Sequence, residues 1–406
     1  MLGFTLAIPF TCHMKTQVAI IGAGPAGLLL SHLLDQLGIE SVIIENKSRE
    51  YIEARIRAGV LETQSVDLLV ETGLGDRLKK EGLEHHGIYL QTPGERVHIN
   101  FNELIGKSVW VYGQTEVTKD LNQARDKAGQ VIYYSASEVA LHGIESAQPS
   151  VTFLDADGNP QVIEALYIAG CDGFHGISRA SIPSQTIVTY ERNYNFGWLG
   201  VMAEVAPSTD ELIYAWHPNG FAMHSMRSKT RSRLYLQVDP DEDIKNWSDD
   251  RIWSELAKRM HVDGWHLQSG PIIEKGITPM RSFVSTPMRY GNLFLAGDAA
   301  HIVPPTGAKG LNLAIADVKV LSTALARALH FRDTSLIDSY SDTALARVWR
   351  STYFSWWMTS MLHTSGNGDP FDDQLQSAQI KAVVSSPSAM AALAENYVGI
   401  PFASQS

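Results

Sequence analysis

The chain opens with short apolar runs separated by turns. An apolar run at 17–21 ends in a glycine-rich turn, and leucines at near-helical spacing follow over 27–37. Gly38 stands where a helix C-cap is expected, because glycine readily adopts the left-handed backbone that ends many helices. A second apolar run of strand length covers 41–45. This order predicts one strand–helix–strand unit.

Downstream, the pattern changes. Short strands around an Asp157–Gly158 turn predict a small hairpin-rich insert over 131–169. Alternating, β-branched or aromatic stretches then predict a separate antiparallel sheet from runs at 196–205, 212–215, 220–226 and 231–238. Further helices are expected at 64–72, 116–128, 310–329 and 345–362, and a further buried strand at 293–297.

The glycine-rich turn carries the first functional motif. Gly22, Gly24 and Gly27 form a Gly-x-Gly-x-x-Gly pattern between a predicted strand and a predicted helix. Such glycines permit a tight turn, close approach of a pyrophosphate and close helix–strand packing. Glu45 follows at the end of the next strand, where a carboxylate can bind ribose hydroxyls. The spacing predicts a dinucleotide site, with a ligand-free turn as the alternative, and it does not separate FAD from NAD.

Two later segments narrow the choice of nucleotide. Asp298 follows the apolar run that ends at 296, and Asp172 follows the run at 165–169. An Asp at a strand end can reach a ribose or ribityl chain, although an Asp also caps helices. Next to Asp172, glycines together with His175 and Arg179 offer groups for phosphate or ribose, and a polar surface turn is the alternative.

The expected fold is mixed α/β, with a Rossmann-like nucleotide-binding domain, a separate β-sheet domain and C-terminal helices. The chain of 406 residues is long enough for two or three domains. We expect the nucleotide-binding domain at 14–187 and again at 286–406, where the C-terminal helical region also lies, and the β-sheet domain at 188–285. Residues 1–13 lack the features of a secretory signal, so we interpret Met14 as the natural start and 1–13 as a disordered extension.

Charge and cysteine content limit the partners. The formal net charge of −11, without a basic cluster, argues against nucleic acid or an anionic membrane as the main partner. Cys12 and Cys171 cannot form a disulfide framework, which fits a reducing, cytoplasmic location. No apolar run reaches the length of a membrane span.

These motifs together resemble the class A flavoprotein aromatic hydroxylases. The stretches 55–62, 111–116, 171–179, 297–312 and 354–360 are similar, within that family, to the members that act on 4-hydroxybenzoate, and the resemblance extends from Met14 to Pro401. It implies bound FAD, NADPH and O2 as co-substrates, and conversion of 4-hydroxybenzoate to 3,4-dihydroxybenzoate through a flavin C4a-hydroperoxide. It also implies a homodimer, and no metal site is expected.

The resemblance further implies a substrate site for a small aromatic acid. Ser225 and Arg227 are two residues apart and share one face of a strand, where an exposed Ser and Arg would be the alternative. By resemblance they bind the substrate carboxylate with Tyr235, and Met223 lines the pocket. Catalytic roles in activating the phenol and moving its proton are implied for Tyr214, Tyr397, His85 and Pro305.

Cofactor contacts are carried over in the same way. FAD contacts are implied for Gly22, Gly24, Ala26, Gly27, Glu45, Arg55, Arg57, Gln114, Asp172, Arg233, Asp298, Gly307, Lys309, Leu311 and Asn312. Arg233 is the implied gate for movement of the flavin, and Lys309 and Asn312 lie at an electropositive helix start that favours an anionic reduced flavin. NAD(P)H contacts are implied for Lys47, Tyr51, Arg55, Phe174, His175, Arg179 and Arg281.

Three points stay open at this level. Lys47 and Tyr51 favour NADPH over NADH, but the arginine that the NADPH-preferring members carry in this segment has no counterpart at its position, although Arg49 lies nearby. A hydroxylase for another ring acid, such as an aminobenzoate, is one alternative function. A flavin-binding protein without hydroxylase activity, such as a sensor, is another, and the joint presence of Tyr214, Tyr397 and His85 argues against it.

Overall fold

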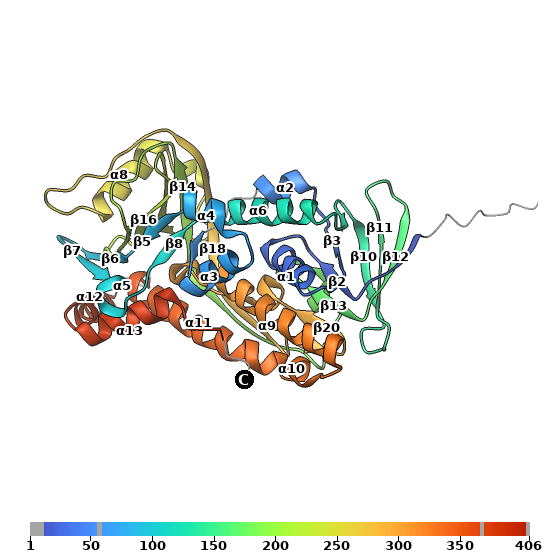
Figure 1. Ribbon diagram of the computed structural model, residues 1–406. Helices are drawn as coiled ribbons and strands as arrows, with labels where there is room; N and C mark the ends of the chain where they lie inside the picture. Colours follow the sequence, from blue (N-terminus) through green and yellow to red (C-terminus); the bar gives the residue numbers. More distant parts are fainter. Residues whose placement is uncertain (1–11, 55–58, 366–368, 403–406) are drawn as a thin grey trace, which may run out of the picture.

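A mainly parallel sheet forms one half of the molecule (Figure 1). The computed structural model describes residues 12–54, 59–365 and 369–402. The sheet has six strands in the order β19-β20-β13-β2-β3-β9, parallel except for β19. Its strands are β2 (Val18–Ile21), β3 (Ser41–Ile44), β9 (Ile132–Tyr133), β13 (Tyr167–Gly170), β19 (Arg289–Tyr290) and β20 (Leu293–Leu295). The predicted strands at 17–21, 41–45 and 293–297 are thereby confirmed.

Helices cover this sheet and bury its apolar strands. The predicted helix after the glycine turn is α1 (Pro25–Gln36), which contacts both α6 (Gln114–Lys127) and α9 (Gly310–Phe331). Strands β2 and β3 are buried along their whole length, as expected for parallel strands with helices on their faces. The resulting apolar core of the sheet and its helices is one continuous cluster.

A second, larger sheet forms the other half. It has eight strands in the order β21-β18-β14-β17-β16-β15-β6-β7. One of its faces shares an apolar cluster with α11 (Tyr340–Leu362), α12 (Pro370–Val384) and α13 (Pro387–Val398), and the other packs on α8 (Asp249–Arg259). The strands are β6 (Gly87–Thr92), β7 (Glu95–Asn100), β14 (Val188–Ala203), β15 (Leu212–Ala215), β16 (Ala222–Ser228), β17 (Arg231–Val238), β18 (Ile272–Thr286) and β21 (His301–Ile302).

The two halves are joined by long strands. Strands β14 and β18 pair over most of their length and run from the large sheet toward the six-stranded sheet (Figure 1). Strand β14 begins at Val188 and β18 ends at Thr286. These points lie next to the predicted domain boundaries, and the domain division itself remains a prediction.

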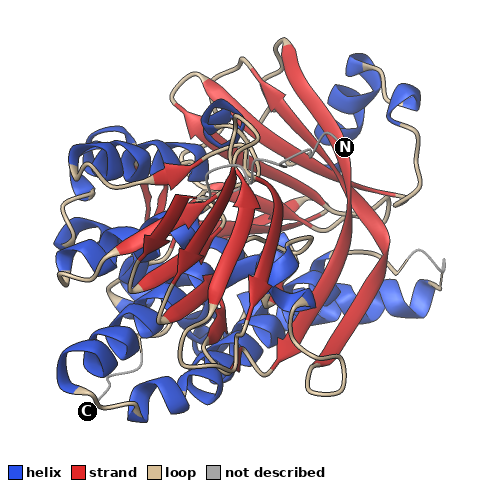
Figure 2. Ribbon diagram, turned by 90° about the vertical axis from the view of Figure 1, so that its right-hand side faces the viewer, coloured by secondary structure: helices blue, strands red, loops and turns tan. Residues whose placement is uncertain are grey.

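Two small sheets complete the β structure. The hairpin-rich insert is a four-stranded sheet that lies on the side of the molecule facing the viewer in Figure 2. Its strands are β1 (Cys12–Lys15), β10 (Ser137–His142), β11 (Ser150–Leu154) and β12 (Pro160–Glu164). Residues 12 and 13 already belong to β1, which pairs with β12, while 1–11 lie outside the described residues. The other small sheet contains β4 (Val60–Leu61), β5 (Leu83–His85) and β8 (Val109–Val111).

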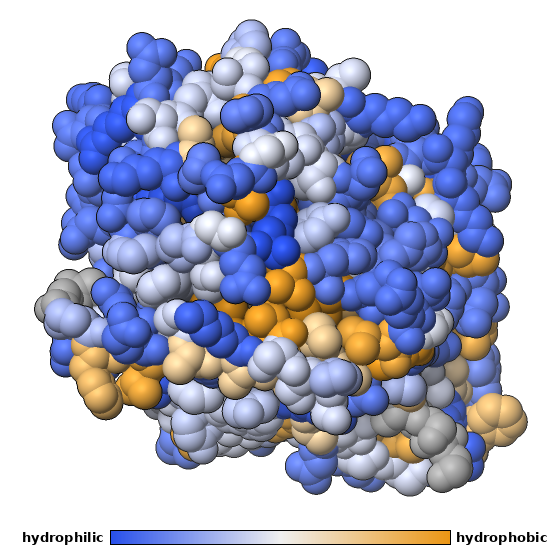
Figure 3. Space-filling view, turned by 90° about the vertical axis from the view of Figure 1, so that its left-hand side faces the viewer, coloured by the Kyte–Doolittle hydropathy of each residue, from blue (hydrophilic) through white to orange (hydrophobic). Residues whose placement is uncertain are grey.

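Short helices fill the connections. They are α2 (Arg49–Ala54), α3 (Thr63–Glu71), α4 (Gly75–Glu81), α5 (Phe101–Ile105), α7 (Ile177–Ala180), α10 (Ser335–Asp338), η1 (Ile244–Asn246), η2 (Gly297–Ala299) and η3 (Pro305–Gly307). On the face seen in Figure 3, apolar residues gather in a central hollow between hydrophilic margins. No helix among the described residues combines the length and the apolar character that a membrane crossing requires.

The glycine turn is tightly enclosed. Gly22 has φ of +101°, and a Cβ there would lie 2.5 Å from the carbonyl oxygen of Cys171. A Cβ on Gly27 would collide with the carbonyl oxygen of Gly22. The turn therefore needs glycine at both positions, for backbone conformation at the first and for close packing at both.

We expect Gly27→Ala to lower the free energy of unfolding by about 1–3 kcal/mol, because overpacking forces the turn apart. Denaturant unfolding of the purified protein measures this. Gly276→Ala is the matched control, since Gly276 is exposed and a Cβ there meets no atom within 4 Å. Equal stability of both variants would contradict the expectation.

Candidate active site

The first part of the site is the start of α1. Gly24 is its N-cap, no side chain among the described residues caps it, and its first turn holds no acidic residue. The backbone N–H groups at this end are therefore available to an anion, which the helix dipole also favours. Glu45 lies beside the turn and is 6% exposed, with one oxygen accepting from Ala23 N at 2.6 Å and the other from Lys47 N at 2.8 Å.

Asp298 lies close to this turn. A Cβ on Gly297, whose φ is +62°, would contact Ala26 at 3.5 Å and Ala314 at 3.2 Å, so the turn before α9 abuts the start of α1. Asp298 is exposed while its neighbours on both sides are buried. The structure thus brings together two segments that lie more than 270 residues apart, as a shared nucleotide site requires.

Asp172 is used within its own loop. Its Oδ2 accepts hydrogen bonds from the backbone N and the hydroxyl of Ser178, both at 2.9 Å, at the start of α7. Its Oδ1 is buried without a hydrogen-bond partner among the described residues. Burial raises the pKa of Asp172. One oxygen therefore orders the loop, and the other is left for a ligand donor.

Four of the predicted NAD(P)H residues lie together. The guanidinium carbons of Arg179 and Arg281 lie 4.7 and 4.8 Å from the ring centre of Phe174, and the ring of His175 lies 4.9 Å from it. Arg179 also donates to the carbonyl oxygen of Ala299 at 2.7 Å. This cluster is cationic and aromatic, as a binding surface for a nucleotide would be.

The remaining nucleotide predictions lie at other points. Lys47 and Tyr51 are exposed neighbours, with Nζ 5.9 Å from the ring centre. Gln114 is the first residue of α6 and is half-buried. Arg55 and Arg57 lie outside the described residues.

Three of the predicted substrate residues lie in one row of the large sheet. Strand pairing places Met223 between Tyr214 and Tyr235 in one row across β15, β16 and β17. The next row along these strands pairs Ser225 with Arg233, and Arg227 follows two residues after Ser225. The register shifts between Met226 and Ser228, so strand alternation does not extend to Arg227, and the common face of Ser225 and Arg227 stays a prediction.

Two guanidiniums surround Tyr235. Arg233 Nε donates to its hydroxyl at 3.3 Å, and Arg227 also interacts with it. Burial alone would raise the pKa of Tyr235, but the positive charges of Arg227 and Arg233 outweigh burial and lower it. Ser225 Oγ donates to the carbonyl oxygen of Arg233 at 3.0 Å. Two guanidiniums next to one tyrosine hydroxyl suit a carboxylate.

A buried pair of tyrosines lies at the other end of this row. The hydroxyls of Tyr214 on β15 and Tyr397 on α13 are 2.7 Å apart, and both side chains are almost fully buried. Burial raises the pKa of both tyrosines, so both are neutral at pH 7. His85, considered from sequence as a surface residue or a proton relay, is 1% exposed, and its Nδ1 lies 2.8 Å from Glu211 Oε2.

The segment before α9 packs against α11. Pro305 and Gly307 begin and end η3, and a Cβ on Gly307 would lie 2.5 Å from Ser355 Oγ on α11. Leu311 packs at the edge of the nucleotide-domain core. Asn312 accepts from the backbone N of Glu62 at 2.9 Å through its side-chain oxygen.

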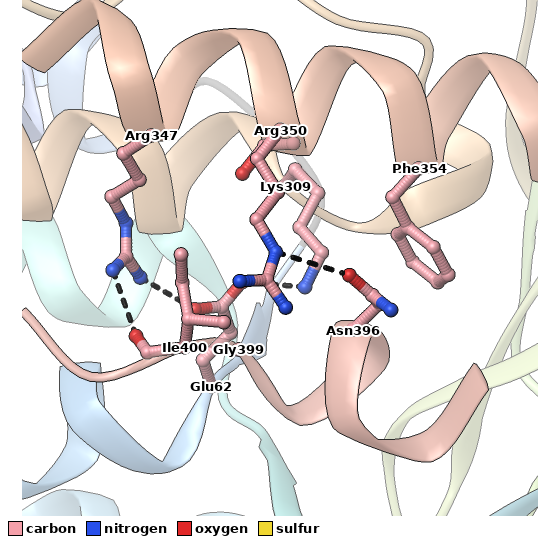
Figure 4. Close-up of a pocket in the computed structure, with 9 residues that line it drawn as sticks. Glu62, Lys309, Arg347, Arg350, Phe354, Asn396, Gly399 and Ile400 are labelled. Atoms are coloured by element: carbon pink, nitrogen blue, oxygen red, sulfur yellow. Dashed lines mark hydrogen bonds and ion pairs between the residues drawn. The ribbon is translucent and has the colours of Figure 1, made fainter. Parts of the chain in front are cut away.

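Lys309 forms a buried ion pair with Glu62, which the sequence analysis did not identify as a site residue. Its Nζ lies 2.6 Å from Glu62 Oε1 and 2.9 Å from the carbonyl oxygen of Tyr397, while Arg347 binds the other Glu62 oxygen at 3.0 Å (Figure 4). Burial lowers the pKa of Lys309, although Glu62 opposes this. The lysine is the N-cap of α9, as expected, but its charge is balanced within the protein.

Asp317 is a second residue that sequence inspection missed. Its Oδ2 accepts from the backbone N of Gly297 at 2.9 Å and lies 2.6 Å from His301 Nε2, and both side chains are buried. Burial disfavours the imidazolium, but Asp317 outweighs burial and raises the pKa of His301. The pair therefore holds the turn that presents Asp298. A helix residue twenty positions away from this turn carries no local signal of that contact.

Known proteins resemble this chain over most of its length. Residues 15–355 match the family described as FAD binding domain. The p-hydroxybenzoate hydroxylase of Acinetobacter baylyi is 52% identical over 391 residues, which cover 96% of each chain. A 3-(3-hydroxy-phenyl)propionate/3-hydroxycinnamic acid hydroxylase of Comamonas testosteroni is 25% identical over 80% of this chain and 55% of its own.

Solved structures share the fold. The p-nitrophenol 4-monooxygenase of Pseudomonas putida superimposes with a TM-score of 0.82 at 18% identity, covering 96% of this chain and 99% of that one. An anhydrotetracycline hydroxylase of Streptomyces rimosus gives a TM-score of 0.73 at 20% identity, covering 95% of this chain and 76% of that one. At these low sequence identities, the similarity to the solved structures supports a shared fold alone.

We expect the stability contributed by His301 to depend on pH. Because its folded pKa is raised, this contribution is fully present below the unfolded pKa of about 6.5 and is lost as pH rises through the folded pKa. The loss of unfolding free energy in His301→Gln should therefore be larger at pH 6 than at pH 9. The difference should be about 1.4 kcal/mol for each tenfold increase in the proton affinity of the ring on folding. Denaturant unfolding at both pH values measures it, and a larger loss at pH 9 would refute the assignment.

Proposed function

This chain belongs to the FAD binding domain family, as a class A flavoprotein hydroxylase, and on that basis we propose that it hydroxylates 4-hydroxybenzoate to 3,4-dihydroxybenzoate with NADPH and O2. The observation that carries the proposal is the row of Tyr214, Met223 and Tyr235 across three strands, in which Arg227 interacts with Tyr235 and Tyr397 binds Tyr214. A cationic end and a pair of neutral tyrosines match the two ends of this substrate.

The residues of the nucleotide site fit FAD. The uncapped start of α1 suits a pyrophosphate, while Glu45, the exposed Asp298 and the Oδ1 of Asp172, which has no partner among the described residues, offer acceptors for hydroxyl groups. Gly22, Gly24, Ala26 and Gly27 hold the turn, and we assign Gln114, Gly307, Leu311 and Asn312 to the remaining contacts. When bound, FAD supplies the reduction of oxygen and the transfer of one oxygen atom to the ring.

The substrate is oriented by its two polar ends. Arg227 binds the carboxylate, with Ser225 and Tyr235 as neighbouring hydroxyls, and Met223 lies against the ring between them and Tyr214. At the other end, the Tyr214 hydroxyl accepts a hydrogen bond from the phenol and donates its own to Tyr397. Moving the phenol proton away makes the ring electron-rich, which electrophilic hydroxylation needs. Pro305 is assigned to the phenol end of the substrate, and Arg233, which donates to Tyr235, is assigned to the gate for movement of the flavin.

The same residues separate this proposal from a related hydroxylase for an aminobenzoate. An amino group cannot transfer a proton to the tyrosine pair as readily as a phenol, so the Tyr214–Tyr397 pair would have no function in activating it. Product analysis on both ring acids distinguishes the two, since an aminobenzoate hydroxylase would leave 4-hydroxybenzoate unchanged.

For the coenzyme we propose NADPH. The ammonium of Lys47 and the hydroxyl of Tyr51 are exposed and adjacent, where a 2′-phosphate can bind them. Arg49 of the same segment is held by Glu53 and Asp126, so its charge is already paired. Phe174, His175, Arg179 and Arg281 are assigned to the rest of this coenzyme. Comparison of kcat/KM for NADPH and NADH tests the choice.

We also propose a cytoplasmic homodimer. One face of α11 exposes Trp349, Tyr353 and Trp356, with fractional exposures of 42%, 62% and 38%, and Tyr190 packs edge-on against Trp349. An exposed aromatic stripe of this size is typical of an interface. Light scattering of the purified protein measures the oligomeric state, and cell fractionation tests the location.

Purified enzyme with NADPH and oxygen should convert 4-hydroxybenzoate to 3,4-dihydroxybenzoate, and Arg227→Gln should weaken substrate binding about tenfold to a hundredfold. The reason is that hydrogen bonds to charged groups contribute about 1.5–3 kcal/mol. Substrate titration of the flavin spectrum gives the Kd. The control is Arg231→Gln, because Arg231 lies on the neighbouring strand and pairs at the surface with Glu204. Absence of the product with wild-type protein would overturn the proposed function.

Tyr214→Phe should keep substrate affinity within about threefold but should uncouple NADPH oxidation from hydroxylation, because the phenol loses its hydrogen-bond partner. The ratio of product formed to NADPH consumed measures coupling. Tyr89→Phe is the control, since Tyr89 lies on the neighbouring strand β6 and packs on the opposite face of the sheet. If Tyr214→Phe stayed as coupled as this control, its assigned role would be wrong.

A further inference from the structure

A buried carboxylate lies behind His85. Glu211 Oε2 is 2.8 Å from His85 Nδ1, and its Oε1 accepts from the backbone N of His86 at 3.0 Å. Building on the proposed function, we propose that Glu211 is a positioning residue for proton removal. It keeps His85 protonated on Nδ1, leaves Nε2 as the proton-accepting atom, and stabilises the imidazolium that forms.

The position of Glu211 follows from the meeting of two sheets. His85 ends β5 in the small three-stranded sheet, whereas Glu211 directly precedes β15, the strand that carries Tyr214. The carboxylate therefore links the segment of His85 to the strand of the first tyrosine. Its two oxygens hold both a ring nitrogen and a backbone donor, so the imidazole is held in one orientation.

This contact decides the tautomer. An ionised carboxylate only accepts hydrogen bonds, so Nδ1 of His85 must carry the proton that lies between them. In the neutral ring, Nε2 then has the free lone pair. Nε2 is buried and has no hydrogen-bond partner in the part of the chain that the structure describes. The ring thus presents a basic nitrogen that none of the described side chains occupies.

The tyrosine pair is packed against this histidine segment. Phe101 donates its backbone N–H to the carbonyl oxygen of His86 at 2.6 Å, and its ring centre is 5.1 Å from that of Tyr397. Val109, which pairs with His85 across β5 and β8, belongs to the same apolar cluster as both tyrosines. Besides burial, which raises the pKa of Tyr397, the Glu211 charge raises it further. The carboxylate is therefore close enough to act on the tyrosine pair.

Exposure increases along the chain of titratable groups. The side chains of His85, Glu211 and His98 are 1%, 12% and 33% exposed, and His98 Nε2 lies 3.9 Å from Glu211 Oε1. His224 also faces this region, but burial lowers its pKa to about 4 and its Nε2 accepts from Ser208 N, so it stays neutral. Side-chain exposure therefore rises from His85 through Glu211 to His98.

The step is a proton transfer and needs no redox partner. The phenol O–H bond breaks as Tyr214 takes the proton, Tyr214 gives its own to Tyr397, and His85 Nε2 takes up the proton that leaves this pair. The imidazolium is neutralised by Glu211 until a proton is lost to water on the side of His98. One proton enters and one leaves, and the phenolate remains.

The test compares Glu211→Gln with wild-type, FAD-loaded enzyme. Glu84→Gln is the matched control, because Glu84 lies on the same strand as His85 but is exposed and binds Ser108. The first readout is 15N NMR of histidine-labelled protein, with the His85 signal identified by its loss in His85→Gln. Wild type and Glu84→Gln should show the neutral His85 ring protonated on Nδ1, and Glu211→Gln should show a mixture of the Nδ1-protonated and Nε2-protonated tautomers.

The second readout is proton release when 4-hydroxybenzoate binds, followed with a pH-indicator dye by stopped flow. It should slow about tenfold in Glu211→Gln and stay unchanged in Glu84→Gln, with substrate Kd within about twofold in both. An unchanged release rate and an unchanged tautomer in Glu211→Gln would overturn the proposal. If that variant fails to fold, wild-type His85 found protonated on Nε2 in the neutral form would overturn it, and the Nδ1 form would support it.

This design separates the two hypotheses. If wild-type enzyme makes no 3,4-dihydroxybenzoate, the proposed function fails, while the NMR readout still reports the tautomer that Glu211 imposes. If product forms but Glu211→Gln leaves both readouts unchanged, only the inference about Glu211 fails.

Discussion

The arrangement of the site depends on one buried carboxylate, that of Glu62. It is 3% exposed, so its charge must be compensated inside the protein. Lys309 at the start of α9 and Arg347 on α11 supply that compensation, and their partner is at least 247 residues away along the chain. Breaking the pair would leave an uncompensated buried charge, so the positions of both helices relative to the nucleotide sheet are tied to Glu62.

The same network extends into the substrate site. Lys309 also binds the carbonyl oxygen of Tyr397, in the last turn of α13, and the Tyr397 hydroxyl binds Tyr214 on the large sheet. A single chain of contacts therefore links the nucleotide half to the tyrosine pair. The charge of Lys309 contributes to this link as a structural element, in addition to the electropositive start of α9.

Two further buried carboxylates act in a similar way. Asp317 and Glu211 each bind a histidine ring together with a backbone N–H group. Glu62 differs, because its two oxygens bind cationic side chains and its own backbone N–H donates to Asn312, near the same helix start as Lys309. Asp317 and Glu211 each fix the position of a histidine ring relative to a backbone segment, as a positioning group should.

Local patterns were sufficient for the first unit of the fold. The strand before Gly22, the helix after Gly27 and the strand that ends next to Glu45 follow from apolar periodicity and glycine placement, because these signals act between near neighbours. The proposed substrate residues Tyr214 and Tyr235 were identified by resemblance alone, since an isolated Tyr on a strand has no distinctive pattern.

By itself, therefore, the sequence determined the nucleotide turn, the first strand–helix–strand unit and the family. Only the tertiary structure decided which charges meet. It enclosed Lys309 with Glu62, buried His85 against Glu211 and placed Asp317 under the Asp298 turn. The physical reason is that the pairing of a buried charge depends on which distant segments exclude water around it, and no local spacing records that choice.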